Sequence, residues 1–252
     1  MVDLPPLYDD LTFLSPLSDE RAASLVGFIA DAHPDTVLDI GCDWGELLLR
    51  SLAAVPEARG LGVDLESQHL EDARRRAVER GLADWASFDA RDARTFTGSF
   101  DAVVCIGASQ IWGPQVDEEQ PLDYTAALVA LRQLLPAGGR LVYGEAVWSV
   151  PPTAAAMSAL GGRPDEYLAV DSVVALARQH GFSVANVEVA TQGEWDAFEA
   201  GFRAGFEHWI HAHPADHEDQ QEVHRQLQDQ RDRYMNGYRG VLGMAYLSLI
   251  AD

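Results

Sequence analysis

The sequence predicts an α/β fold, a mostly parallel and doubly wound sheet with helices on both faces. The first observation is that short β-branched or apolar runs alternate with amphipathic helical segments between residues 36 and 146. Such alternation is typical of parallel strands joined by right-handed crossover helices. The second is a glycine turn at residues 41–45, directly after the first of these runs. Ligands of such sheets bind beyond the carboxyl ends of the strands, so the turn marks a candidate site.

The expected elements follow one another along the chain. A first helix is capped by Ser18, and its inward face is Ala22, Leu25, Val26 and Ile29. Strands are expected at residues 36–40, 60–65, 85–90, 100–106, 140–146, 182–189 and 241–250. Further helices are expected after the glycine turn, after a cap at Ser67, over residues 122–135, and after a cap at Asp171. The helix after Ser67 is expected to turn Leu70, Ala73, Ala77 and Val78 inward. Two helical patterns, residues 194–211 and 216–234, form an insertion before the last strand.

Length and composition predict a single domain over residues 1–252. A chain of 252 residues with 47% hydrophobic content buries one large core. We expect an N-terminal helical cap at residues 1–35 and a helical insertion or lid at residues 191–237. The acidic start does not resemble a targeting signal, and the longest apolar stretch, residues 241–251, is about half of what crosses a bilayer. We therefore expect a cytoplasmic protein with no membrane span.

The charge of the chain excludes several functions. The formal net charge is −22 and all 18 basic residues are arginines. Without lysine, Schiff-base catalysis and a P-loop lysine are excluded. Nucleic acid is a poor candidate partner because no run of basic residues could neutralise a phosphate backbone. Cys42 and Cys105 both fall in expected buried segments, which suits reduced thiols.

The glycine turn and Asp64 together indicate an adenosine-binding site. A glycine turn between a strand and a helix lets backbone N–H groups approach a ligand closely. Asp64 ends the next strand, where its carboxylate can accept both hydroxyls of a ribose. The alternative is a tight turn followed by an ordinary surface acid.

Five segments, in order and spacing, resemble the motifs of class I S-adenosylmethionine-dependent methyltransferases of the bacterial small-molecule type. Residues 37–45 resemble the first motif and residues 62–66 the second. Asp92 and Ala93 resemble the adenine-binding pair, with Asp89 as the competing alignment. Residues 99–104 resemble the fourth-strand motif and residues 134–141 the turn before the fifth strand.

This resemblance, which covers residues 18 to 150, implies a fold, a cofactor and a site. It implies a Rossmann-like sheet of seven strands whose last strand is antiparallel. The implied cofactor is S-adenosylmethionine (SAM), and the implied activity is methyl transfer to a small-molecule acceptor. The implied cofactor-binding residues are Asp39, Gly41, Cys42, Asp43, Gly45, Asp64, Leu65, Asp92, Ala93, Ile106 and Gly107.

One residue departs from the family pattern. Asp43 stands where the family has its middle glycine. Aspartate tolerates a left-handed backbone better than most residues, so the turn can be kept. The carboxylate could attract the amino group or sulfonium of SAM, or it could repel the carboxylate of SAM.

The acceptor is expected beyond the fourth and fifth strands. Glu145 is the candidate for an acceptor contact or general base, with a purely structural hydrogen bond as the alternative. Trp112, Trp148, Trp195 and Arg239 are the other candidates for the acceptor pocket. Trp195 begins a helical aromatic stripe that fits ordinary packing or the wall of a lid. Arg239 could anchor an acceptor carboxylate or form a surface ion pair.

Two other functions remain open, and several properties are not predicted. A nucleotide-dependent oxidoreductase would also bind adenosine with a glycine turn and an acid after the next strand. Its expected G-x-G-x-x-G pattern, however, differs from the spacing of Gly41 and Gly45. A degenerate, non-catalytic methyltransferase scaffold is the other alternative. The histidines between residues 208 and 224 span a break at Pro214 and are not expected to bind metal. The acceptor atom and the oligomeric state are left open.

Overall fold

A computed structural model describes residue 8, residues 10–113 and residues 121–252. Its seven-stranded sheet has the order β3-β2-β1-β4-β5-β7-β6. The strands are β1 (Thr36–Ile40), β2 (Arg59–Asp64), β3 (Ala86–Ala90), β4 (Ala102–Ile106), β5 (Arg140–Trp148), β6 (Phe182–Val189) and β7 (Leu242–Ala251). Only the last of these runs antiparallel to its two neighbours, β5 and β6. The Rossmann-like sheet expected from the sequence is therefore confirmed.

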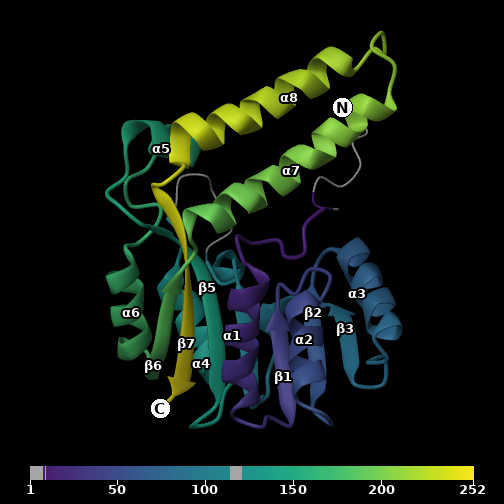
Figure 1. Ribbon diagram of the computed structural model, residues 1–252. Coiled ribbons are helices and arrows are strands. Elements are labelled where there is room, and N and C mark those ends of the chain that lie inside the picture. The colour runs from purple at the N-terminus through teal and green to yellow at the C-terminus, as the bar shows by residue number, and fades with distance from the viewer. Residues whose placement is uncertain (1–7, 9, 114–120) are drawn as a thin grey trace.

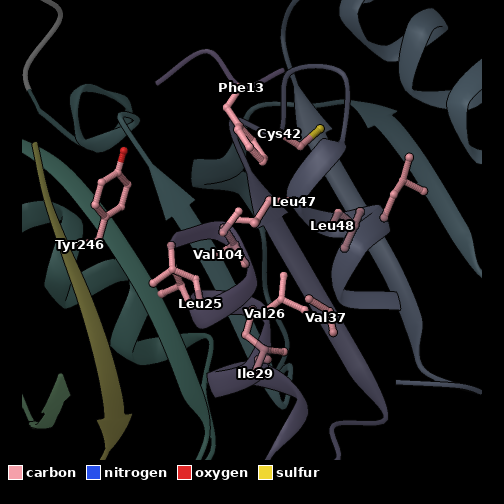
Figure 2. Packing of buried hydrophobic residues seen from close by; sticks show 14 of the residues in the cluster. Phe13, Leu25, Val26, Ile29, Val37, Cys42, Leu47, Leu48, Val104 and Tyr246 are labelled. Carbon is pink, nitrogen blue, oxygen red and sulfur yellow. The ribbon is translucent and has the colours of Figure 1, made fainter. Parts of the chain in front are cut away.

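Helices cover both faces of the sheet (Figure 1). On one face, α1 (Asp19–Ala30), α2 (Glu46–Ala54) and α3 (Ser67–Glu79) pack on a core that includes Leu25 and Leu48. Figure 2 shows that core, with Val37 and Val104 of the sheet facing α1 and α2. On the other face, α4 (Tyr124–Gln133) and α6 (Val170–Gln179) pack on a second core. Strand residues alternate between the two cores because successive side chains of a strand point to opposite faces.

The strand order reverses direction between β1 and β4, and this position determines where a ligand can bind. From β1 the chain continues outward to β2 and β3, then returns to the other side of β1 as β4. The loops after β1 and β4 therefore diverge and leave a crevice at the carboxyl edge of the sheet. Residues 41–45 and Gly107 lie in these two loops.

A helical insertion lies between β6 and β7. It comprises α7 (Gln192–Ala212), α8 (Gln220–Asp232) and a π-helical turn, η3 (Arg233–Tyr238). The two long helices lie side by side above the edge at which the parallel strands end (Figure 1). The chain also forms the short helix α5 (Ala154–Ala159) and two 3-10 turns, η1 (Ala93–Thr95) and η2 (Ser109–Ile111). No described helix is long and apolar enough to span a membrane.

Local predictions are confirmed at some positions and wrong at others. Ser18 caps α1 by accepting the N–H of Arg21, and all four inward residues of that helix are buried. Ser67 is the first residue of α3, and Glu66 caps it instead. Val78, expected inward, is 67% exposed. Ala169 precedes α6, so Asp171 lies in its first turn and does not cap it. Of the expected N-terminal cap, residues 1–7 and 9 lie outside the described part of the chain.

Candidate cofactor site

The turn after β1 brings the backbone close to the neighbouring strands. Gly41 and Gly45 have φ values of +68° and +71°, in the left-handed region that favours glycine. A Cβ on Gly41 would come within 2.9 Å of the Ala108 Cβ, and one on Gly45 within 2.7 Å of the Phe88 ring. The N–H groups of Gly41 and Cys42 both donate to the carbonyl of Val63 on β2. Glycine is therefore required at both ends of the turn.

Asp43 adopts a left-handed backbone conformation, the region that glycine favours. Its φ is +48°, which aspartate adopts at lower cost than most residues. Its N–H donates to Asp64 Oδ2 at 3.0 Å, and the N–H of Glu66 donates to Asp64 Oδ1 at 2.9 Å. These two bonds orient the Asp64 carboxylate at the edge of the sheet. Each of its oxygens keeps a lone pair for a further donor.

Two adjoining cavities lie at this edge. The larger, about 310 Å³, is lined by Asp64, Asp92 and Ala93 among others, and by Ile106 and Gly107 after β4. The smaller, about 50 Å³, lies deeper; its lining includes Asp39, Cys42, Val104 and Phe13. Four residues line both cavities: Leu14, Gly41, Asp43 and Ile106. Most of the predicted cofactor-binding residues thus come together. Leu65 also lines the larger cavity, although it is 75% exposed.

Asp39 and Asp43 share this site with Asp64, and burial together with the neighbouring charges raises the pKa of both Asp39 and Asp43. Burial, followed by the charge of Asp64, raises the pKa of Asp39 to about 7, although the Leu48 backbone N–H opposes this. Burial and the charges of Asp64 and Asp39 raise the pKa of Asp43 to about 8. Like charges this close disfavour simultaneous ionisation. In the cofactor-free site, the carboxyl groups of Asp39 and Asp43 are therefore partly protonated at neutral pH.

Asp92 lies at the far end of the larger cavity. It caps η1 by accepting the N–H of Arg94, and the Arg94 guanidinium forms an ion pair with it at 2.6 Å. These hydrogen bonds lower the pKa of Asp92. Asp89, the competing residue, is paired with Arg91 and is absent from the described lining of the cavity. The arrangement favours Asp92 over Asp89 as the adenine-side acid.

His69 was not predicted as a site residue, yet it lines the larger cavity. It is the third residue of α3 and is buried, with Nδ1 3.7 Å from Asp43 Oδ1. Neither of its ring nitrogens has a hydrogen-bond partner. The ring packs edge-on against Trp44. One ligand atom each from Asp43, Asp64 and His69 lie within 4.8 Å of one another, so these three described residues could also hold a metal ion.

The segment before α1 covers the deeper cavity. Phe13, Leu14, Ser15 and Leu17 line that cavity from above. The indole of Trp44 donates to the Thr12 carbonyl at 2.8 Å, and Ser15 Oγ lies 2.7 Å from the Tyr246 hydroxyl. Figure 2 shows Phe13 beside Cys42 over the core. The sequence predicted a cap over residues 1–35 but not these contacts, because residues 11–17 have no periodic pattern.

Glu145 is buried and bonded to backbone. Ala146 N–H donates to its Oε1 at 2.9 Å and Ser109 N–H donates to its Oε2 at 3.1 Å. Burial raises the pKa of Glu145 against these bonds. The residue is absent from the described linings of both cofactor cavities. Through these bonds Glu145 links the loop after β4 to β5. Its role as a general base stays a prediction.

The structure separates the other acceptor candidates from these cavities. Trp112 lines a cavity of about 220 Å³ with Phe96 instead. The Trp148 indole donates to the Pro164 carbonyl at 2.9 Å. Trp195 packs against neighbouring rings, and Arg239 forms a two-point ion pair with Asp196 at 2.8 Å. The surface ion pair is therefore observed for Arg239.

Comparison with known proteins relates this geometry to a family. The sequence matches a methyltransferase domain model over residues 37–139. The uncharacterized protein YjhP of Escherichia coli strain K12 is 29% identical over 242 residues, which are 94% of this chain and 93% of that protein. A SAM-dependent methyltransferase from Thiobacillus denitrificans, solved with S-adenosylhomocysteine, is 28% identical, with a TM-score of 0.82 and 100% of both chains covered. One from Geobacter sulfurreducens, also solved with S-adenosylhomocysteine, is 25% identical, with the same TM-score and coverage.

The fold is that of a methyltransferase-like α/β protein, with the glycine turn and Asp64 together at the carboxyl edge of its sheet. The full-length matches to solved relatives extend this likeness beyond the central motifs. The chain is thus similar along its whole length to SAM-dependent methyltransferases, and SAM is the cofactor that its sequence predicts.

The residues present fit this cofactor. Gly41 lines both cavities with its backbone alone, because Ala108 leaves no room for a side chain there. Asp64 presents a carboxylate, the group that suits two ribose hydroxyls. The unpartnered nitrogens of buried His69 face the same region as Asp43. Asp43 is compatible with the turn because it adopts a positive φ, which aspartate tolerates better than most residues.

Proposed function

We propose that this protein transfers the methyl group of SAM to a small-molecule acceptor. The observation that supports the proposal best is the pair of cavities at the strand-order reversal, which join Asp64 to the glycine turn through shared lining residues. SAM supplies an activated methyl group on a sulfonium. The protein has to hold this cofactor, exclude water and align the acceptor.

Each part of the site has a proposed task. Asp64 accepts the ribose hydroxyls, with its orientation set by the N–H groups of Asp43 and Glu66. Asp92 and Ala93 border the adenine, and Gly41 lets the backbone approach the methionine end. At about 50 Å³, the deeper cavity is far smaller than the roughly 300–1,000 Å³ of small-molecule sites. The segment over it, residues 11–17, therefore has to shift to admit the methionine end.

The acceptor is placed in a neighbouring cavity of about 790 Å³, within the range of small-molecule sites. It lies between the segment before α1 and the start of α7, and shares Phe13, Ser15 and Leu17 with the deeper cofactor cavity. Phe198 contributes an aromatic wall from α7. This lining supports the proposal that residues 191–237 form a lid, since Thr191 and the start of α7 border the cavity. The described lining of this cavity lacks Trp112, Trp148, Trp195 and Arg239.

A labelling experiment tests this function. Purified protein is incubated with methyl-tritiated SAM and a cell extract freed of its own SAM, and the products are separated by ultrafiltration. Label should enter the small-molecule fraction with the wild-type protein and not with D64A. Label found solely in protein or nucleic acid would contradict a small-molecule acceptor. Absence of transfer into every fraction, with SAM still bound, would favour a non-catalytic scaffold.

A further inference from the structure

We infer that Asp43 makes the cofactor site discriminate between SAM, which has a positive sulfonium, and the product S-adenosylhomocysteine, which has a neutral sulfur. The inference rests on the proposed function, because it concerns the release of the product of that reaction. An enzyme that binds its product as tightly as its substrate is inhibited by turnover. A carboxylate beside the sulfur favours the cation and leaves the neutral product without that attraction.

The position of Asp43 is the first argument. Leu14, Gly41, Asp43 and Ile106 line both cofactor cavities, and Asp43 is the charged member of this group. The sulfur of SAM links the adenosine to the methionine chain. A ligand with its ribose at Asp64 and its methionine end in the deeper cavity therefore places the sulfur at the junction between the two.

The second argument is the weakness of competing positive charge. Arg91 lines the larger cavity, but its guanidinium is 2.9 Å from Asp89. His69 faces Asp43 with Nδ1 at 3.7 Å from Oδ1 and has no hydrogen bond of its own. The other titratable groups in the described lining are the carboxylates Asp39, Glu46, Asp64, Glu66 and Asp92 and the Cys42 thiol, whose pKa is raised by burial. Of these, Glu46 and Asp92 are neutralised by arginines. The junction therefore has an excess of negative charge when its acids are ionised.

Calorimetric titrations of SAM and S-adenosylhomocysteine, with EDTA present, test the inference. The probe variant is D43N, which removes the charge and keeps a residue that tolerates positive φ. The ratio of the dissociation constants, product over SAM, should be about tenfold lower in D43N than in the wild type. A second variant, D43G, also removes the charge and suits the positive φ of this position, and it should lower the ratio to the same extent.

The outcomes separate this inference from the proposed function. An equal ratio in the wild type and D43N would overturn the discrimination while cofactor binding stands. Absence of binding of either ligand to the folded wild type would overturn the proposed function itself. If D43N unfolds, the ratio in D43G decides in the same way, because glycine suits the positive φ of this position. A difference that appears only when EDTA is replaced by zinc would assign the effect to a metal on Asp43, Asp64 and His69, and would overturn the inference.

Discussion

Replacement of Asp64 by alanine should weaken the binding of S-adenosylhomocysteine by about 1.5–3 kcal/mol, or roughly 10- to 150-fold. The magnitude follows from hydrogen bonds between a charged acceptor and the ribose hydroxyls, at least one of which is lost. The assay is titration calorimetry of wild-type and variant protein. D89A is the matched control, because Asp89 is the next-to-last residue of the neighbouring strand β3, pairs with Arg91 and is the competing alignment for the adenine-side acid.

The structure also predicts that D64A keeps the fold. Two backbone donors, Asp43 N–H and Glu66 N–H, lose their acceptor, at about 1 kcal/mol each. This loss is offset because Asp64 also raises the pKa of Asp39 and of Asp43, so its removal relieves repulsion. Thermal unfolding should therefore change little. Unchanged affinity in folded D64A, or an equal loss of affinity in D89A, would refute the assignment of the ribose to Asp64.

Three further predictions follow from other contacts. E194Q should destabilise the fold by about 2 kcal/mol, because Glu194 accepts from Ser18, Arg21 and Thr191 and joins α1 to α7. Burial would raise the pKa of Glu194, but these hydrogen bonds lower it to about 2. Chemical unfolding should therefore show that the contribution of Glu194 to the free energy of unfolding is lost as pH falls from about 4.5 towards 2. E20Q is the control and should not change this pH dependence. F198A should reduce label transfer to the acceptor several-fold and leave S-adenosylhomocysteine affinity unchanged, since Phe198 lines the acceptor cavity and neither cofactor cavity. An equal loss of transfer and of S-adenosylhomocysteine affinity would contradict this prediction. E145Q should lower the free energy of unfolding by about 1–3 kcal/mol and leave cofactor affinity unchanged. If instead methyl transfer falls more than about 100-fold at unchanged stability, Glu145 is a general base.

The order of the elements could be predicted because it depends on local patterns. The apolar spacing of Ala22, Leu25, Val26 and Ile29 identified the face of α1, and Ser18 identified its start. The error at Val78 shows the limit of such patterns. Ala77 and Val78 are adjacent and therefore about 100° apart on the helix, and only Ala77 is buried.

The site could be predicted where it follows the strands, and not where distant segments meet. Asp64 and the glycine turn are at strand ends, so the sheet brings them together. The cover formed by residues 11–17 depends on the Trp44 indole reaching Thr12 and Ser15 reaching Tyr246. Those pairings join segments up to 231 residues apart, which no local pattern encodes. The same holds for Arg239, whose partner Asp196 lies on α7.

A crystal structure of this protein with S-adenosylhomocysteine tests the account most directly. The account predicts that the ribose hydroxyls bind the Asp64 carboxylate, that the adenine lies beside Asp92 and Ala93, and that the sulfur lies at the junction lined by Gly41, Asp43 and Ile106. It also predicts that residues 11–17 move away from the deeper cavity while the cavity beside Phe198 stays open for the acceptor. A ligand whose ribose lies away from Asp64, or whose methionine end occupies the cavity beside Phe198, would contradict the account.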